Sequence, residues 1–186
     1  MSTKTTIEWT STVHSDGTIT SGRSWNPVTG CTHVSPGCDH CYAEVMAKRL
    51  QAMGQPHYAH GFAVTLHEDI LTLPLTWKQP SRIFVNSMSD LMHTQVPDAF
   101  IAQAFAVMRE ASWHTFQILT KRPGRLRRLA TTLDWPPNVW IGVSIEADRF
   151  VARADALRTV PASCRFLSCE PLLRPLPSLN FDGISW

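Results

Sequence analysis

From residue 25 onward, short apolar runs alternate along the chain with stretches of helical periodicity. The runs with the residue types and lengths of β-strands are 25–30, 82–86, 115–120, 138–144 and 165–168. Almost every residue of 138–144 is apolar, which is typical of a strand covered on both faces of a parallel sheet. Repeated strand–helix units of this kind predict a parallel α/β architecture.

Helical patterns and breaks fill the intervals between these runs. A helix is predicted after Cys38, with apolar positions from Tyr42 to Leu50 and Asp39 available as its cap. Pro97 can open a second helix. A short basic helix is expected after 121–123, and a further helix over 150–157. Residues 54–80 predict a long connection, and 184–186 the start of a sixth strand.

Polar residues follow the predicted strands at their carboxyl ends. These residues are Cys31, Ser87, Ser89, Asp90, Thr120, Lys121, Ser144, Glu146, Cys169 and Glu170. In a parallel β/α barrel, the carboxyl ends of the strands share the face on which chemistry is built. A closed barrel of eight units takes about 250 residues, whereas this chain of 186 residues holds five units and a fragment. The predicted fold is therefore a partial, open parallel β/α barrel.

Composition adds a domain division and a cellular setting. Residues 1–24 are polar and predict an N-terminal extension and loop, and residues 25–186 predict the barrel domain. The apolar fraction of 44% predicts a globular chain, and a net charge of +2 is too small to indicate a nucleic-acid partner by itself. We expect no membrane span and no secretory signal. Five cysteines, three of them crowded together, favour a metal site in a reducing cytoplasm.

The crowded cysteines, Cys31, Cys38 and Cys41, have the spacing C-x6-C-x2-C. Three thiolates can bind one metal centre but leave a fourth position to fill. A side chain such as His33 or His40 would complete a structural zinc site, whereas a substrate or cofactor would make the site a chemical one. The spacing alone leaves both alternatives open. Two further cysteines flank the fifth predicted strand and are interpreted as ordinary buried thiols.

Several motifs along the chain resemble those of one protein family. They are 7–10, 25–31, 35–38, 41–44, 84–91, 119–123, 142–146, 165–168 and 170–173. Together they resemble the phage gp thirty-seven/gp sixty-eight family, three-Cys-motif phage proteins of unknown function, over nearly the whole chain. The resemblance implies a phage or prophage origin. Members of that family normally continue past residues 184–186 into a Gly-Gly-Glu segment and a final helix, which predicts a truncated and inactive product as one alternative.

That family is in turn similar to radical S-adenosylmethionine (SAM) enzymes, although their usual cysteine spacing is C-x3-C-x2-C. The resemblance implies that the three cysteines hold a [4Fe–4S] cluster whose fourth iron binds SAM, and that an electron donor drives reductive cleavage of SAM for an unknown substrate. Further cofactor-binding residues are hypotheses from position. His40 would lie against the adenine, and Lys121 would meet the SAM carboxylate. Ser87, Ser89 and Asp90 would contact the SAM amino group or ribose. Ser144 is included as a cofactor-binding candidate because it also stands at a strand end.

The remaining candidates each have two interpretations. A basic cluster is either a solvated helix face or a phosphate-binding patch that would suit a nucleic-acid substrate; its members are Lys121, Arg122, Arg125, Arg127 and Arg128. Glu146 and Glu170 are either acid–base groups or partners of nearby arginines such as Arg149 and Arg174. We interpret His57, His60 and His67 as surface histidines. The rival to the enzyme is a zinc-stabilised, non-catalytic binding module.

Overall fold

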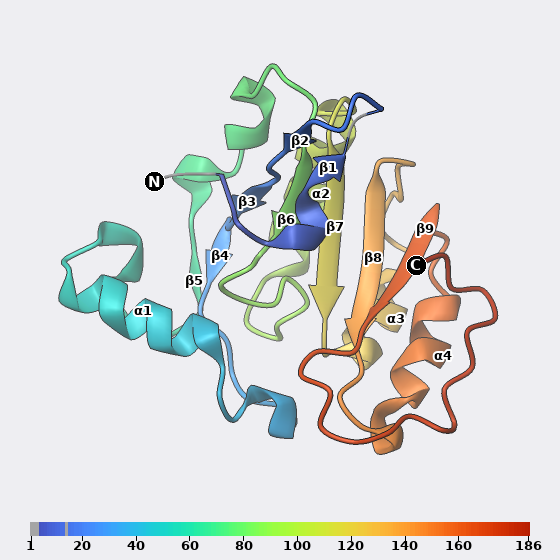
Figure 1. Cartoon of the computed structure of the whole chain (residues 1–186). Helices are drawn as coiled ribbons and strands as arrows, with labels where there is room; N and C mark the ends of the chain where they lie inside the picture. Colours follow the sequence, from blue (N-terminus) through green and yellow to red (C-terminus); the bar gives the residue numbers. More distant parts are fainter. Residues whose placement is uncertain (1–3, 14) are drawn as a thin grey trace.

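A five-stranded parallel sheet lies at the centre of the protein, in a computed structural model that describes residues 4–13 and 15–186 (Figure 1). Its strand order is β3-β6-β7-β8-β9. The strands are β3 (Arg23–Trp25), β6 (Arg82–Val85), β7 (Thr115–Thr120), β8 (Val139–Ser144) and β9 (Cys164–Ser168). Each strand is therefore followed in the sheet by the next parallel strand along the chain, and all five carboxyl ends point the same way. Within the described residues the sheet is open, with β3 and β9 at its edges.

Four of the predicted strands are confirmed to within two residues, but the first prediction was wrong in its extent. The strand predicted at 25–30 is divided at Pro27, which has no N–H to donate to a strand ladder. Before the break, β3 pairs with β6. After it, β4 (Val28–Thr29) leaves the main sheet and pairs antiparallel with β5 (Thr65–Leu66), which lies inside the predicted connection.

The described part of the chain has four α-helices: α1 (Tyr42–Ala52), α2 (Asp98–Glu110), α3 (Pro123–Leu129) and α4 (Ala152–Arg158). Pro97 stands at the N-cap of α2, as predicted. The prediction that Asp39 caps α1 was wrong, because Cys41 is the N-cap residue and no side chain caps that end. The Asp39 N–H instead donates to the Pro36 carbonyl and closes the short 3₁₀ turn η2 (Pro36–Cys38).

The main hydrophobic core lies between one face of the sheet and the helices behind it in Figure 1. Strand residues of this core include Ile83, Val85, Phe116, Ile118 and Ile141, each fully buried. Burying one such side chain stabilises the fold by about 1.5 to 3 kcal/mol. The core therefore fixes the strands, and with them the loops at their carboxyl ends.

The segment before β3 packs on the opposite face of the sheet. Trp9, in the 3₁₀ turn η1 (Glu8–Thr10), meets the Phe84 ring edge-on at a centroid distance of 4.6 Å and lies 6.3 Å from the Phe166 ring. A largely exposed hairpin of β1 (Thr12–Val13) and β2 (Ile19–Thr20) follows. The predicted extension 1–24 also includes residues 1–3 and 14, which lie outside the described residues.

Further 3₁₀ turns lie between the strands and helices, and the last residues of the chain form hydrogen bonds with β9. The turns are η3 (Pro56–Tyr58), η4 (Glu68–Ile70), η5 (Leu73–Thr76) and η6 (Asp148–Phe150). At the other end, the Trp186 N–H donates to the Arg165 carbonyl and the Leu167 N–H donates to the Trp186 carbonyl. The two bonds have the pattern of a parallel pair, but among the described residues 184–186 form no strand, so the predicted start of a sixth strand was wrong. Among the described residues, no helix combines the length and apolar character needed to cross a bilayer.

Candidate functional site

The three crowded cysteines line one cavity at the carboxyl edge of the sheet. Its volume is about 160 Å³, and Cys31, Cys38 and Cys41 all contribute to its wall. The wall also includes residues that follow or end β6, β7 and β8, among them Asn86, Lys121 and Ser144. In Figure 1 the arrowheads of β7 and β8 are directed towards the same end of the molecule as the cysteine loop. Of the predicted strand-end residues, Cys31, Lys121 and Ser144 therefore lie around one cavity.

Gly30 starts the cysteine loop where two segments pass very close to each other. Its φ is +81°, and a Cβ atom built there would lie 2.2 Å from the carbonyl oxygen of Ala63. Only glycine fits such a position without moving the backbone. The Gly30 N–H donates to the Met88 carbonyl, and the Cys31 N–H donates to the Phe62 carbonyl. These bonds attach the first cysteine to both the segment after β6 and the connection before β5.

The thiols of this loop are not arranged around a single-ion position. All five cysteines are free. Among the described residues, one group of three potential ligands has its ligand atoms within 4.8 Å of one another, and that group is His57, His67 and Asp69. Tetrahedral zinc with Zn–S bonds of about 2.3 Å holds its sulfur atoms about 3.8 Å apart. His33, one of the candidate fourth ligands, instead pairs with Glu44 at 3.0 Å.

Asp90 organises the wall of the cavity from within the protein. Its carboxylate accepts hydrogen bonds from the Thr120 hydroxyl (2.8 and 2.9 Å), the Met92 N–H (2.9 Å) and the Lys121 N–H (3.2 Å). The Arg122 Nε lies 3.6 Å from it. With these partners the carboxylate fixes the segment after β7 against the segment after β6. Three donors of the protein already bond this carboxylate, so Asp90 acts on the site by positioning other groups.

Arg122 links this network to the first cysteine. Its guanidinium donates to the Thr32 carbonyl (2.9 Å) and hydroxyl (3.0 Å), and lies 3.7 Å from Cys31 Sγ. Burial and the negative charge of Asp90 raise the pKa of the Cys31 thiol, and the opposing effect of Arg122 does not cancel them. Cys31 in the metal-free protein is therefore predominantly a thiol at neutral pH.

Asn86 is a polar residue of the cavity wall that the sequence analysis did not assign to the site. Its side chain is 3% exposed, and neither its amide nitrogen nor its amide oxygen has a hydrogen-bond partner. Its backbone has a φ of +62°, a conformation that costs a non-glycine residue roughly 1 kcal/mol or more. A buried amide without partners typically costs about 1 to 3 kcal/mol. Both features favour a role for Asn86 in binding a polar ligand in the cavity.

The other predicted cofactor-binding residues are divided between the cavity and its surroundings. Ser89, Asp90, Lys121 and Ser144 line it with the cysteines. The Ser89 hydroxyl donates to the Val28 carbonyl at 2.8 Å. Ser87 is not part of the wall, and its hydroxyl bonds the Asn26 side chain at 3.1 Å. His40 is exposed and is also outside the wall.

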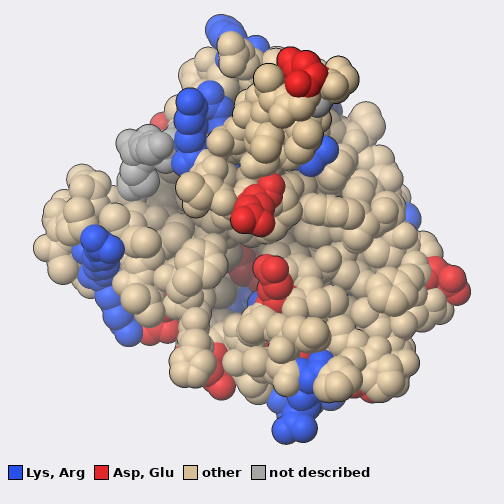
Figure 2. Space-filling view, in the orientation of Figure 1, with Lys and Arg blue, Asp and Glu red and all other residues tan. Residues whose placement is uncertain are grey.

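The basic cluster forms mostly internal contacts. Arg122 pairs with Asp90, and Arg125 and Arg128 both pair with Asp98 at 2.6 to 2.7 Å. On the face drawn in Figure 2, Lys and Arg side chains stand apart from one another and form no continuous basic patch. These contacts agree better with a helix face held by local ion pairs than with a phosphate-binding surface.

Glu146 lies in a buried ion pair, but with a different arginine from the one proposed. Its carboxylate is fully buried and lies 2.7 Å from the Arg153 guanidinium, which also donates to the Ser144 carbonyl. Gly37 of the cysteine loop packs against this side chain, since a Cβ atom at that position would lie 3.2 Å from it. The cysteine loop therefore packs on this ion pair. Because the Glu146 carboxylate is buried and paired with Arg153, it is not free to transfer a proton.

The fold and the site define a parallel α/β protein with a thiol-lined cavity at the carboxyl edge of its sheet. A family model described as "Protein of unknown function (DUF5131)" matches residues 4–186, and the chain belongs to that family. Comparison with curated proteins and with solved structures found no significant match in either set.

Proposed function

We propose that this protein is an iron–sulfur protein of the radical SAM type, with a [4Fe–4S] cluster on Cys31, Cys38 and Cys41. One observation carries the proposal: these three thiols and the unpartnered, buried amide of Asn86 line the same cavity. When bound, the cluster would supply an electron for the reductive cleavage of SAM. The similarity to three-Cys-motif phage proteins and to radical SAM enzymes belongs to this proposal.

Three thiols are the number of protein ligands that such a cluster needs when its fourth iron binds SAM. Each cysteine of a [4Fe–4S] site binds a different iron, so the thiolates stand farther apart than ligands of one ion. The three Sγ atoms are not gathered within 4.8 Å of one another. The sheet order β3-β6-β7-β8-β9, in which strands follow one another in sequence, supports an open, partial β/α barrel.

The residues around the cluster position would bind and orient SAM. Asn86 offers a donor and an acceptor to its polar groups, and the Lys121 ammonium offers a positive charge to its carboxylate. The cavity of about 160 Å³ is smaller than the roughly 300 Å³ at which ligand pockets usually begin. Binding would therefore require wall side chains to move, and Arg122, which reaches across from β7 to the cysteine loop, is the first expected to do so.

The partners follow from the chemistry. Reductive cleavage needs an electron donor that reduces the cluster. The substrate is not specified by the wall of the cavity. A nucleic-acid substrate receives little support, because three arginines of the basic cluster are already in ion pairs.

The test is SAM cleavage by the anaerobically reconstituted protein with dithionite as reductant. We expect methionine release from the parent protein, none from Cys38→Ser, and parental release from Cys169→Ser, a thiol outside the cavity. Equal release by Cys38→Ser and the parent would remove the cysteine loop from the reaction. Lys121→Ala should weaken SAM binding, measured by calorimetry, without loss of iron or sulfide.

A further inference from the structure

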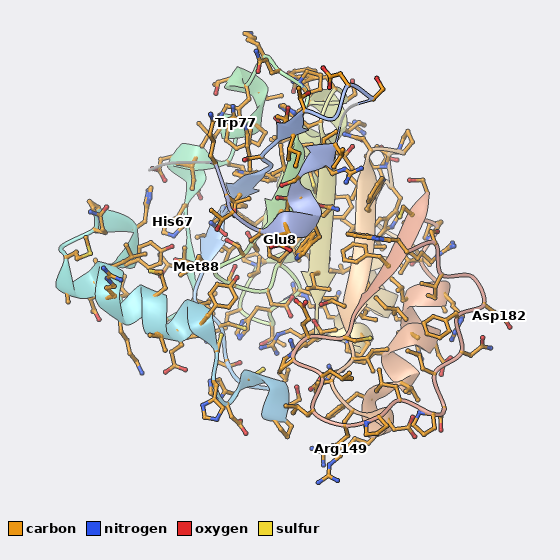
Figure 3. All side chains as sticks on the ribbon, in the orientation of Figure 1. Glu8, His67, Trp77, Met88, Arg149 and Asp182 are labelled. Atoms are coloured by element: carbon orange, nitrogen blue, oxygen red, sulfur yellow. The ribbon has the colours of Figure 1, made fainter. Side chains whose placement is uncertain are left out.

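A second group of potential metal ligands lies in the connection between α1 and β6. His57 is in η3, and His67 and Asp69 are at η4. One ligand atom from each of the three lies within 4.8 Å of the others, and the two imidazole centroids are 4.5 Å apart. Figure 3 shows His67 on the side of the molecule that carries α1, beside β4 and β5. The cysteine cavity has none of these three residues in its wall.

We propose that His57, His67 and Asp69 bind a divalent transition-metal ion of the zinc type. Two imidazoles and one carboxylate form a donor set that such ions favour, and three protein ligands leave a fourth position for water. The prediction that these histidines lie at the surface was wrong for His67, which is 5% exposed. The separations of ten and two residues between the three side chains match no familiar ligand spacing. The fold, through the pairing of β4 with β5, brings them together.

Thr29 orients the buried histidine as an outer partner would. The Thr29 hydroxyl donates to the His57 carbonyl (3.4 Å) and lies 2.8 Å from His67 Nε2. The direction of the Thr29–His67 bond depends on the tautomer of the ring. In the tautomer with the proton on Nε2, the hydroxyl accepts from Nε2–H and Nδ1 keeps the lone pair that a metal needs.

The second histidine and the carboxylate need only a small adjustment. His57 Nε2 lies 2.8 Å from Asp69 Oδ2. Tetrahedral zinc with bonds of about 2.0 to 2.1 Å to nitrogen and oxygen sets such ligand atoms about 3.3 Å apart. The side chains of His57 and Asp69 are 27% and 63% exposed. They are therefore free to move by half an ångström, and an ion can reach them from solvent.

A bound ion would stabilise the connection that holds the cysteine loop. The His67 N–H donates to the Pro27 carbonyl just before β4, and the Phe62 carbonyl of the same connection accepts the Cys31 N–H. Crosslinking η3 to η4 would restrict the movement of the segment that includes Phe62. The expected role of the ion is structural and separate from the chemistry of the cavity.

Cobalt(II) titration of the full-length, metal-free protein tests the site, because cobalt substitutes for zinc and its spectrum distinguishes thiolate from nitrogen and oxygen ligands. We expect one cobalt ion whose d–d bands appear without a thiolate charge-transfer band. His57→Ala and Asp69→Asn should each weaken this binding by about tenfold or more. His60→Ala, an exposed histidine of the same connection, should leave it unchanged.

Circular dichroism of each variant confirms that it is folded, and Asp69→Asn, at an exposed position, keeps the test valid if His57→Ala does not fold. Unchanged cobalt affinity in the folded Asp69→Asn variant would overturn the proposal. Absence of any cobalt binding outside the thiolates would also overturn it, and would leave the His57–Asp69 contact as an ordinary hydrogen bond.

Discussion

Replacing Asp90 with asparagine tests whether this carboxylate organises the cavity wall. The substitution keeps the size of the side chain but removes its charge and replaces one acceptor oxygen with a donor NH₂ group. In the parent, the carboxylate accepts from Thr120, Met92 and Lys121 and lies beside Arg122. In Asp90→Asn, the NH₂ group faces the N–H of either Met92 or Lys121, and the Arg122 charge loses its partner in both orientations.

The magnitude follows from the burial of the pair. The side chains of Asp90 and Arg122 are only 10% and 12% exposed, so water screens the lost charge poorly. Removing one partner of a buried ion pair costs about 3 to 5 kcal/mol. The Nε–Oδ2 distance of 3.6 Å is long for such a pair, which places the expectation at the lower end, about 3 kcal/mol. That loss is a large part of the roughly 5 to 15 kcal/mol by which domains are stable.

Urea unfolding followed by circular dichroism measures this loss. With a slope of about 2 kcal/mol per molar urea, the midpoint should fall by about 1.5 M. Asp134→Asn is the matched control, because its ion pair with Arg109 is more than half exposed and should change stability by less than about 1 kcal/mol. A loss below about 1 kcal/mol in Asp90→Asn, with an unchanged slope, would refute the organising role of this carboxylate.

Three further predictions concern acid stability, ligand binding and packing. Hydrogen bonds from Arg128 and Arg125 lower the pKa of Asp98 from 3.8 to about 2. Its ionised form therefore stabilises the fold above about pH 4, and the stability difference between parent and Asp98→Asn should shrink in urea titrations as pH falls towards 2. Asn86→Gly should melt no lower than the parent, since glycine relieves the positive φ and removes an unpartnered amide, yet it should bind SAM more weakly by calorimetry. Trp9→Ala should cost about 2 to 3 kcal/mol in urea unfolding, because its ring packs on Phe84; a loss below about 0.5 kcal/mol would contradict that packing.

The sheet was predictable because its strands satisfy local and tertiary preferences together. The buried run 138–144 and the run 115–120 are apolar enough to identify β8 and β7 almost residue for residue. The first strand was not, because Pro27 interrupts an otherwise extended segment and the partner of its second half, β5, is a two-residue strand inside a loop. Such short strands have no periodicity of their own and form only when the fold brings them together.

The candidate site was predictable where position along a strand decides it. Strand-end location was enough to bring Ser89, Lys121 and Ser144 to the cavity of the cysteines. It could not show that Asp90 already accepts hydrogen bonds from Thr120 and its neighbours, because that depends on side-chain direction. Asn86 was not predicted, because whether a buried amide has hydrogen-bond partners depends on the residues that the fold places around it.

The central claim is that the cysteine loop holds a [4Fe–4S] cluster, and metal analysis of anaerobically purified protein tests it most directly. Iron, acid-labile sulfide and zinc should be measured on the same sample, with Cys38→Ser alongside. We expect about four irons and four sulfides per parent chain, and loss of both in the variant. Zinc at about one ion per chain without sulfide, lost in the same variant, would contradict it and establish a structural zinc site on these thiols.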